Sequence, residues 1–101
     1  MDEVPMARPG LRILVVDDVP ANLEVLRRAL EGARYQVMVA SSGEVALELA
    51  GHFFPELILL DVMMPGLDGF ETCRRLKQEE KTRSIPVIFL TARDETADLV
   101  E

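Results

Sequence analysis

Short runs of Val, Ile and Leu recur along the chain and alternate with longer amphipathic stretches. Apolar runs of four to six residues are typical of buried strands, and apolar residues spaced three or four apart are typical of helices. We expect strands at residues 12–17, 36–40, 57–61 and 86–90. We expect helices at residues 20–32, 41–52, 69–80 and from Thr91 onward.

Residues with known preferences at helix ends support these boundaries. Pro20 suits a first helical turn and Gly32 a helix end. Ser41 or Ser42 could cap the second helix, with Glu44 placed three residues after Ser41 as in a capping box. Asp68 and Glu71 have the same spacing, which predicts that the third helix begins near Gly69.

Strict alternation of strands and helices with short connections predicts an α/β fold, a parallel sheet with helices on both faces. In such folds ligands bind beyond the C-terminal ends of the strands. Residues 1–11 contain Pro5, Pro9 and Gly10 and are expected to form a flexible N-terminal segment. Residues 12–101 are expected to form one domain, since 101 residues are enough for only one.

Charge and composition exclude several classes of protein. The net charge of -7 argues against a nucleic-acid-binding surface, and the basic cluster Arg74, Arg75 and Lys77 is interpreted as a solvated helix face. No apolar stretch is long enough to cross a membrane, and no secretory signal is present. Cys73 is the single cysteine, so no internal disulfide forms, which fits a cytoplasmic protein.

Three aspartates follow two of the predicted strands. Asp17 and Asp18 come after the run 13–16, and Asp61 ends the run 57–61. Two such strands side by side would bring three carboxylates together, and their mutual repulsion would require a cation or a proton. Oxygen ligands of this kind suit a hard divalent ion such as Mg²⁺.

Three motifs together resemble the receiver domain of two-component response regulators. They are ILVVDD at 13–18, LLDVMMPGLDG at 59–69 and PVIFLTA at 86–92. Each motif alone is weak, but all three occur in order and in the expected elements. The resemblance covers the chain from about Arg12 to its end. It implies a flavodoxin-like, doubly wound parallel sheet with the strand order 2-1-3-4.

The resemblance also implies roles for the site residues. Asp61 matches the phosphoacceptor of the family, whose carboxylate attacks phosphorus. Asp17 and Asp18 match the acidic pair that helps to hold Mg²⁺, with Asp18 as the direct ligand and Asp17 acting partly through water. Met63 matches the position whose backbone carbonyl completes the metal site. The metal would neutralise phosphate oxygens as the anionic donor approaches Asp61.

Further roles concern the signal itself. Thr91 matches the switch hydroxyl that hydrogen-bonds the phosphate, and the backbone N–H of Ala92 could also bind phosphate. The implied donor is a sensor histidine kinase or a phosphotransfer protein. The output would be a changed surface around Thr91 and the fourth helix, and the effector is not identified. The family is regulatory, so no enzymatic activity is expected beyond self-phosphorylation from phosphodonors.

The family fold has a fifth strand, a further helix and a phosphate-binding lysine, which have no counterpart before Glu101. We therefore expect a domain that is incomplete at its C-terminus, a piece of a longer regulator. The strand at 86–90 would then form an open apolar edge. An alternative expectation is a homodimer in which a second copy covers that edge.

Each site residue also has a purely structural interpretation. Asp17 or Asp18 could cap the first helix, and Asp61 could be a turn former. Thr91 could be a helix cap, because Asp94 lies three residues on. Only their convergence on one sheet edge would favour the functional interpretation.

Two other functions are compatible with parts of the sequence. One is a truncated, receiver-like interaction module that no longer signals by phosphorylation. The other is a haloacid-dehalogenase-type hydrolase, which needs an aspartate two residues after its nucleophile, where this chain has Met63. Neither a Gly-rich dinucleotide loop nor a P-loop occurs, which disfavours a nucleotide-binding enzyme.

Overall fold

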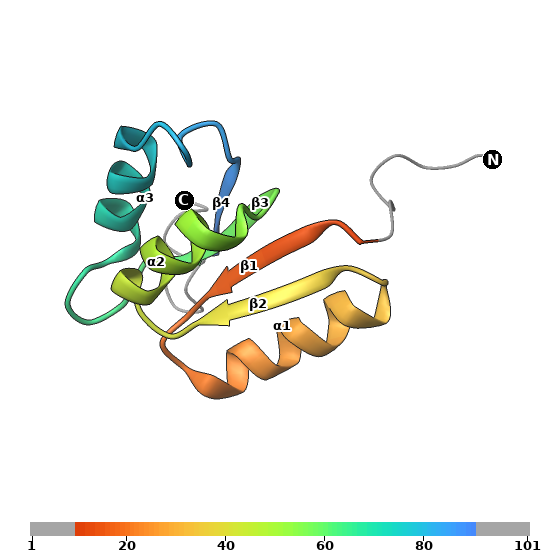
Figure 1. The fold of residues 1–101 in the computed structure, drawn as a ribbon. Helices are drawn as coiled ribbons and strands as arrows, with labels where there is room; N and C mark the ends of the chain where they lie inside the picture. Colours follow the sequence, from red (N-terminus) through yellow and green to blue (C-terminus); the bar gives the residue numbers. More distant parts are fainter. Residues whose placement is uncertain (1–9, 91–101) are drawn as a thin grey trace, which may run out of the picture.

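The computed structural model of the protein describes residues 10–90, which form one parallel sheet flanked by helices (Figure 1). The strands are β1 (Arg12–Val16), β2 (Gln36–Ala40), β3 (Leu57–Asp61) and β4 (Val87–Leu90). The helices are α1 (Pro20–Gly32), α2 (Gly43–Phe53) and α3 (Gly69–Gln78). The sheet order is β2-β1-β3-β4 with every pair parallel, which confirms the predicted flavodoxin-like topology.

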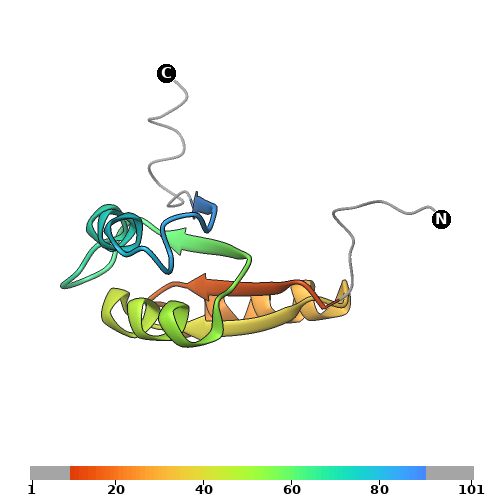
Figure 2. The ribbon, with the colours of Figure 1, turned by 45° about the horizontal axis from the view of Figure 1, so that its top comes forward.

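The central strand β1 is buried on both faces, which explains its continuous apolar sequence. Ile13 and Val15 pack with Leu23 of α1 on one face of the sheet. Leu14 and Val16 belong to the other core, beneath α2 and α3. The two views show α1 and α2 on opposite sides of the sheet (Figure 2). Both cores meet at β1, so this strand and the residues that follow it are held firmly.

Most predicted boundaries agree with the structure, and the differences lie at element ends. The first strand ends at Val16 and the third helix at Gln78, one and two residues before the expected Asp17 and Glu80. The last strand begins at Val87, because Pro86 has no N–H for a sheet hydrogen bond. The helix expected from Thr91 lies outside the described residues.

The capping predictions had mixed outcomes. The Asp68 side chain accepts a hydrogen bond from the N–H of Glu71 at 2.8 Å, which confirms the predicted cap of α3. Ser42, not Ser41, caps α2 by accepting from the N–H of Val45 at 3.2 Å. The capping box of Ser41 with Glu44 was therefore wrong, because the helix begins one residue later than that spacing requires.

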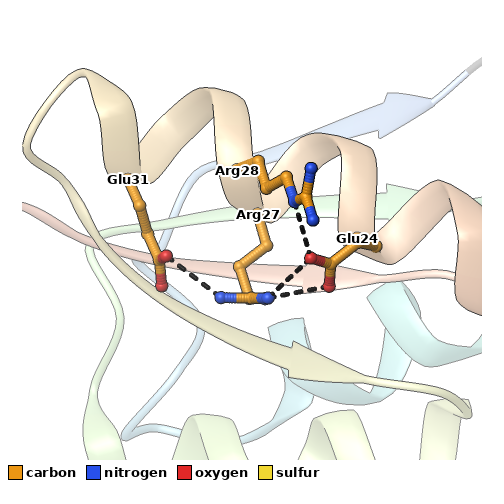
Figure 3. A network of polar contacts seen from close by, with 4 residues as sticks. All are labelled: Glu24, Arg27, Arg28 and Glu31. Carbon is orange, nitrogen blue, oxygen red and sulfur yellow. Dashed lines mark hydrogen bonds and ion pairs between the residues drawn. The ribbon is translucent and has the colours of Figure 1, made fainter.

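The exposed side of α1 carries a network of ion pairs (Figure 3). Arg27 lies between Glu24 and Glu31, with N···O distances of 2.7 and 3.0 Å. Arg28 also pairs with Glu24, at 2.9 Å. All are spaced three or four residues apart, so they support the helix locally, but only weakly because solvent screens exposed ion pairs.

β4 is one edge of the described sheet and carries partly exposed apolar side chains. Ile88 and Phe89 are 52% and 38% exposed, and the Phe89 ring lies 5.2 Å from that of Phe70, between centroids. Pairing of this edge with a second copy of the chain stays a prediction. Among residues 10–90, no helix has the length and apolar content needed to cross a bilayer.

Candidate metal and phosphoacceptor site

Three carboxyl groups meet at the C-terminal edge of the sheet. β1 and β3 are adjacent and parallel, with Val16 opposite Leu60, so the residues that follow both positions emerge side by side. Asp17, Asp18 and Asp61 each offer a carboxylate oxygen, and these oxygens lie within 4.8 Å of one another. The structure therefore brings together the three acids that the sequence placed at two strand ends.

Asp17 is buried and holds the turn between β1 and α1. One of its oxygens accepts a hydrogen bond from the N–H of Val19 at 2.9 Å, and the other accepts from the side-chain amide of Asn22 at 3.2 Å. The N-cap of α1 is Val19, which has no side-chain cap, so Asp17 is not an N-cap. Asn22 was not singled out from the sequence, although its place in the first turn of α1 was predicted.

Asp61 is 6% exposed, and the pKa of its carboxyl group is perturbed. Burial raises the pKa of its carboxyl group, and the negative charges of Asp17 and Asp18 raise that pKa further. Backbone hydrogen bonds from Met63 and Val62 to the carboxylate lower the pKa, but less than the other causes raise it. The ionised side chain is thus unfavourably placed unless positive charge lies near it.

Asp18 and Met63 lie at the more open part of the site. Asp18 is half-buried, and within residues 10–90 no lysine or arginine forms an ion pair with it, with Asp17 or with Asp61. The Met63 side chain is 58% exposed. A shallow hollow of about 460 Å³ runs along this loop, and it is lined by Val62, Met63, Met64, Pro65, Asp68 and Phe70.

The two remaining predicted site residues, Thr91 and Ala92, lie outside the described residues. The strand that precedes them is well placed, since Leu90 of β4 stands opposite Asp61 of β3. Their roles as switch hydroxyl and phosphate-binding backbone stay predictions.

The sequence predicted only that the third helix begins near Gly69, yet this residue lies against the backbone of the candidate acceptor. A Cβ atom built on Gly69 would lie 2.1 Å from the backbone oxygen of Asp61. The sequence does show that Gly69 comes directly after the helix cap Asp68. The spacing alone did not reveal the contact with β3.

Known proteins resemble the chain over almost all of its length. The response regulator PleD of Caulobacter vibrioides is 49% identical over 90 residues, which are 89% of this chain and 20% of PleD. The alkaline phosphatase synthesis transcriptional regulatory protein PhoP of Bacillus subtilis is 46% identical over 89 residues, 88% of this chain and 36% of PhoP. The chain thus spans between a fifth and two fifths of these relatives.

Solved structures agree with the sequence relatives. The N-terminal domain of a response regulator receiver protein from Methanoculleus marisnigri has a TM-score of 0.78 and 41% identity, covering 88% of this chain and 76% of that chain. The receiver domain of sensor histidine kinase PA1611 from Pseudomonas aeruginosa has a TM-score of 0.80 and 33% identity, covering 91% and 75%. That structure has a magnesium ion coordinated in its active site cleft.

The pattern that defines the response regulator receiver domain matches residues 13–101, nearly all of the chain. The strand order and the acidic edge described above agree with that match. The protein therefore belongs to the family of response regulator receiver domains of two-component signalling.

Proposed function

We propose that the protein is a phosphorylation-controlled receiver in which Asp61 accepts a phosphoryl group with the help of Mg²⁺. The donor would be a phosphohistidine on a sensor histidine kinase or a phosphotransfer protein. The observation that carries the proposal is the convergence of Asp17, Asp18 and Asp61 within 4.8 Å at one sheet edge. Three buried or half-buried acids placed this close together are unfavourable for the fold, so a function is the better explanation.

The residues at this edge fit Mg²⁺. All three side chains offer oxygen, which is the ligand that Mg²⁺ prefers. The three oxygens lie within 4.8 Å of one another, close enough for one small divalent ion to be held among them directly or through water. Asp18 and Asp61 would be direct ligands, Asp17 would act partly through water, and the backbone carbonyl of Met63 would complete the set.

The chemical step is an in-line displacement. A carboxylate oxygen of Asp61 forms a bond to phosphorus while the bond between phosphorus and the histidine nitrogen breaks. The nitrogen keeps the electron pair of that bond and takes a proton from solvent. When bound, Mg²⁺ would offset the negative charge of the phosphate oxygens. Asp17, held by Val19 and Asn22, would keep the acidic pair in place during the step.

The output would be a change in surface around Thr91 and the fourth helix expected after it. Thr91 comes directly after Leu90, which stands opposite Asp61 in the sheet. Its hydroxyl would hydrogen-bond a phosphate on Asp61. Formation of that bond would also affect the end of β4, where the exposed Phe89 packs beside Phe70.

Substitution of the acceptor tests the proposal. With Mg²⁺ and a small phosphodonor, intact-mass spectrometry should show one added phosphoryl group on the protein and none on Asp61→Asn. Asp68→Asn is the matched control, because it makes the same change at an exposed helix cap and asparagine caps as well as aspartate. Equal labelling of Asp61→Asn and the unmodified protein would reject Asp61 as the acceptor.

A further inference from the structure

The first residue of α3 is a buried glycine that touches the end of β3. The N–H of Gly69 donates a hydrogen bond to the backbone oxygen of Val62 at 2.9 Å. Val62 follows Asp61, the proposed acceptor, and precedes Met63, the proposed carbonyl ligand. This bond therefore holds the Val62–Met63 peptide group in place. The start of α3 and the two functional positions are thus joined through backbone atoms.

No side chain fits at residue 69. A Cβ atom there would lie 2.1 Å from the backbone oxygen of Asp61 and 2.8 Å from the Cα of Val62, both below the 3.0 Å that real Cβ atoms respect. Gly69 is not among the glycines with positive φ, so other residues could adopt its backbone conformation. Space alone, against an unyielding backbone, is what requires glycine here.

The first turns of α3 are also held by contacts with α2 and within the helix. The next turn of α3 packs against the start of α2, where a Cβ on Gly43 would lie 2.2 Å from the hydroxyl oxygen of Thr72. Thr72 is fully buried and donates to the backbone oxygen of Asp68 at 2.7 Å. Because the start of α3 is held by these contacts, we expect an added methyl group at residue 69 to displace the backbone of Asp61 and Val62.

We propose that Gly69 is a positioning residue for the phosphoacceptor and the metal-binding carbonyl, an inference that rests on the function proposed above. Restoring a 3.0 Å contact from 2.1 Å requires a shift of about 0.9 Å. Functional constellations tolerate displacements of only about 0.5 Å. Gly69→Ala therefore moves Asp61 and Met63 away from their positions relative to Asp17 and Asp18, which follow a different strand.

The first test measures Mg²⁺ affinity by calorimetric titration. Gly69→Ala should bind about 10- to 100-fold more weakly, the range for loss of a residue that orients metal ligands. Gly51→Ala is the matched control, because a Cβ there meets nothing within 4 Å. Leu76→Ala controls for destabilisation, since it opens a cavity in the apolar core under the same helix. Gly51→Ala and Leu76→Ala should both keep the Mg²⁺ affinity of the unmodified protein.

A second readout needs no metal. In buffer with a chelator, Gly69→Ala should shift the amide resonances of Val62 and Met63 strongly, whereas Leu76→Ala should leave both near their original positions. If the unmodified protein binds no Mg²⁺, the proposed function fails, and these resonances still decide whether Gly69 sets the loop geometry. Unchanged resonances, or an affinity equal to that of Gly51→Ala, overturn the inference.

A further pair of variants covers the case in which Gly69→Ala does not fold. Asp68→Ala removes the 2.8 Å hydrogen bond that fixes the first turn of α3, and Asp68→Asn keeps it while making the same change of charge. Asp68→Ala should weaken Mg²⁺ binding and shift the Met63 amide relative to Asp68→Asn. Identical behaviour of the two would show that the start of α3 does not position the site.

Discussion

The carboxyl group of Asp61 is buried and lies beside two other acids. Burial and the neighbouring negative charges both make its ionised form less stable. Its pKa is raised first by burial and then by Asp17 and Asp18. A raised pKa in an acid means that ionisation is harder in the folded protein than in the unfolded chain. In metal-free protein the ionised Asp61 therefore lowers the free energy of unfolding.

Asp61→Asn should accordingly stabilise the metal-free protein at neutral pH, by about 0.5–2 kcal/mol, as single substitutions at strained functional sites often do. As pH falls below the ordinary carboxyl pKa of 3.8, Asp61 is protonated in both states and the advantage should disappear. Urea unfolding with a chelator, across this pH range, measures the difference. A variant less stable than the unmodified protein at neutral pH would contradict the explanation.

The sequence revealed some of the site residues and not others. Asp17, Asp18 and Asp61 were found because each ends an apolar run, and parallel strands deliver their ends to one edge. Asn22 and Gly69 were not recognised as part of the site. Their roles depend on tertiary distances, the contact of Asn22 with Asp17 and of Gly69 with Asp61, and spacing along the chain does not encode those distances.

At the scale of elements, sequence signals placed helix and strand interiors better than their ends. Pro20–Gly32, Gln36–Ala40 and Leu57–Asp61 have the predicted bounds. α3 ends at Gln78, and Thr82 lies a few residues on and donates to the backbone oxygen of Leu76 at 2.7 Å. This buried contact turns the chain toward β4, and helical periodicity carries no information about it.

α3 also carries a charge cluster with a testable pH dependence. Arg74 and Arg75 both bind Glu71, and they lower the pKa of its carboxyl group to about 2 from 4.5. A lowered pKa contributes stability that is present above pH 4.5 and is lost as pH falls toward about 2. Glu71→Gln should therefore unfold at lower urea than the unmodified protein at neutral pH.

The difference in urea midpoint between Glu71→Gln and the unmodified protein should become smaller as pH falls through this range. It should also become smaller in high salt, which screens exposed ion pairs. Glu31→Gln is the control, since Glu31 pairs with Arg27 and lies in a different helix, α1. A gap between Glu71→Gln and the unmodified protein that stays constant from neutral pH to about pH 2 would exclude the ion pairs as its cause.

At the scale of the whole molecule, two cores share one sheet, and the acidic edge is where the fold leaves charge unbalanced. Alternation of strands and helices was enough to predict a parallel sheet with its ligand edge. The order β2-β1-β3-β4 was expected only through the family resemblance, since alternation alone permits other orders. The order matters because it makes β1 and β3 neighbours, and that adjacency joins Asp17 and Asp18 to Asp61.

A ligand that binds this edge only in the folded state must stabilise the whole molecule. Mg²⁺ at about 100 times its dissociation constant should raise the free energy of unfolding by about 2.7 kcal/mol, measured as a shift of the urea midpoint against buffer with a chelator. Asp18→Asn should lose most of this shift, because it removes the half-buried proposed ligand while leaving the buried Asp17 contacts intact. Sodium chloride at matched ionic strength controls for general screening. A shift that is equal in both proteins, or equally produced by sodium, would mean that the divalent ion acts elsewhere and that the three acids do not form its site.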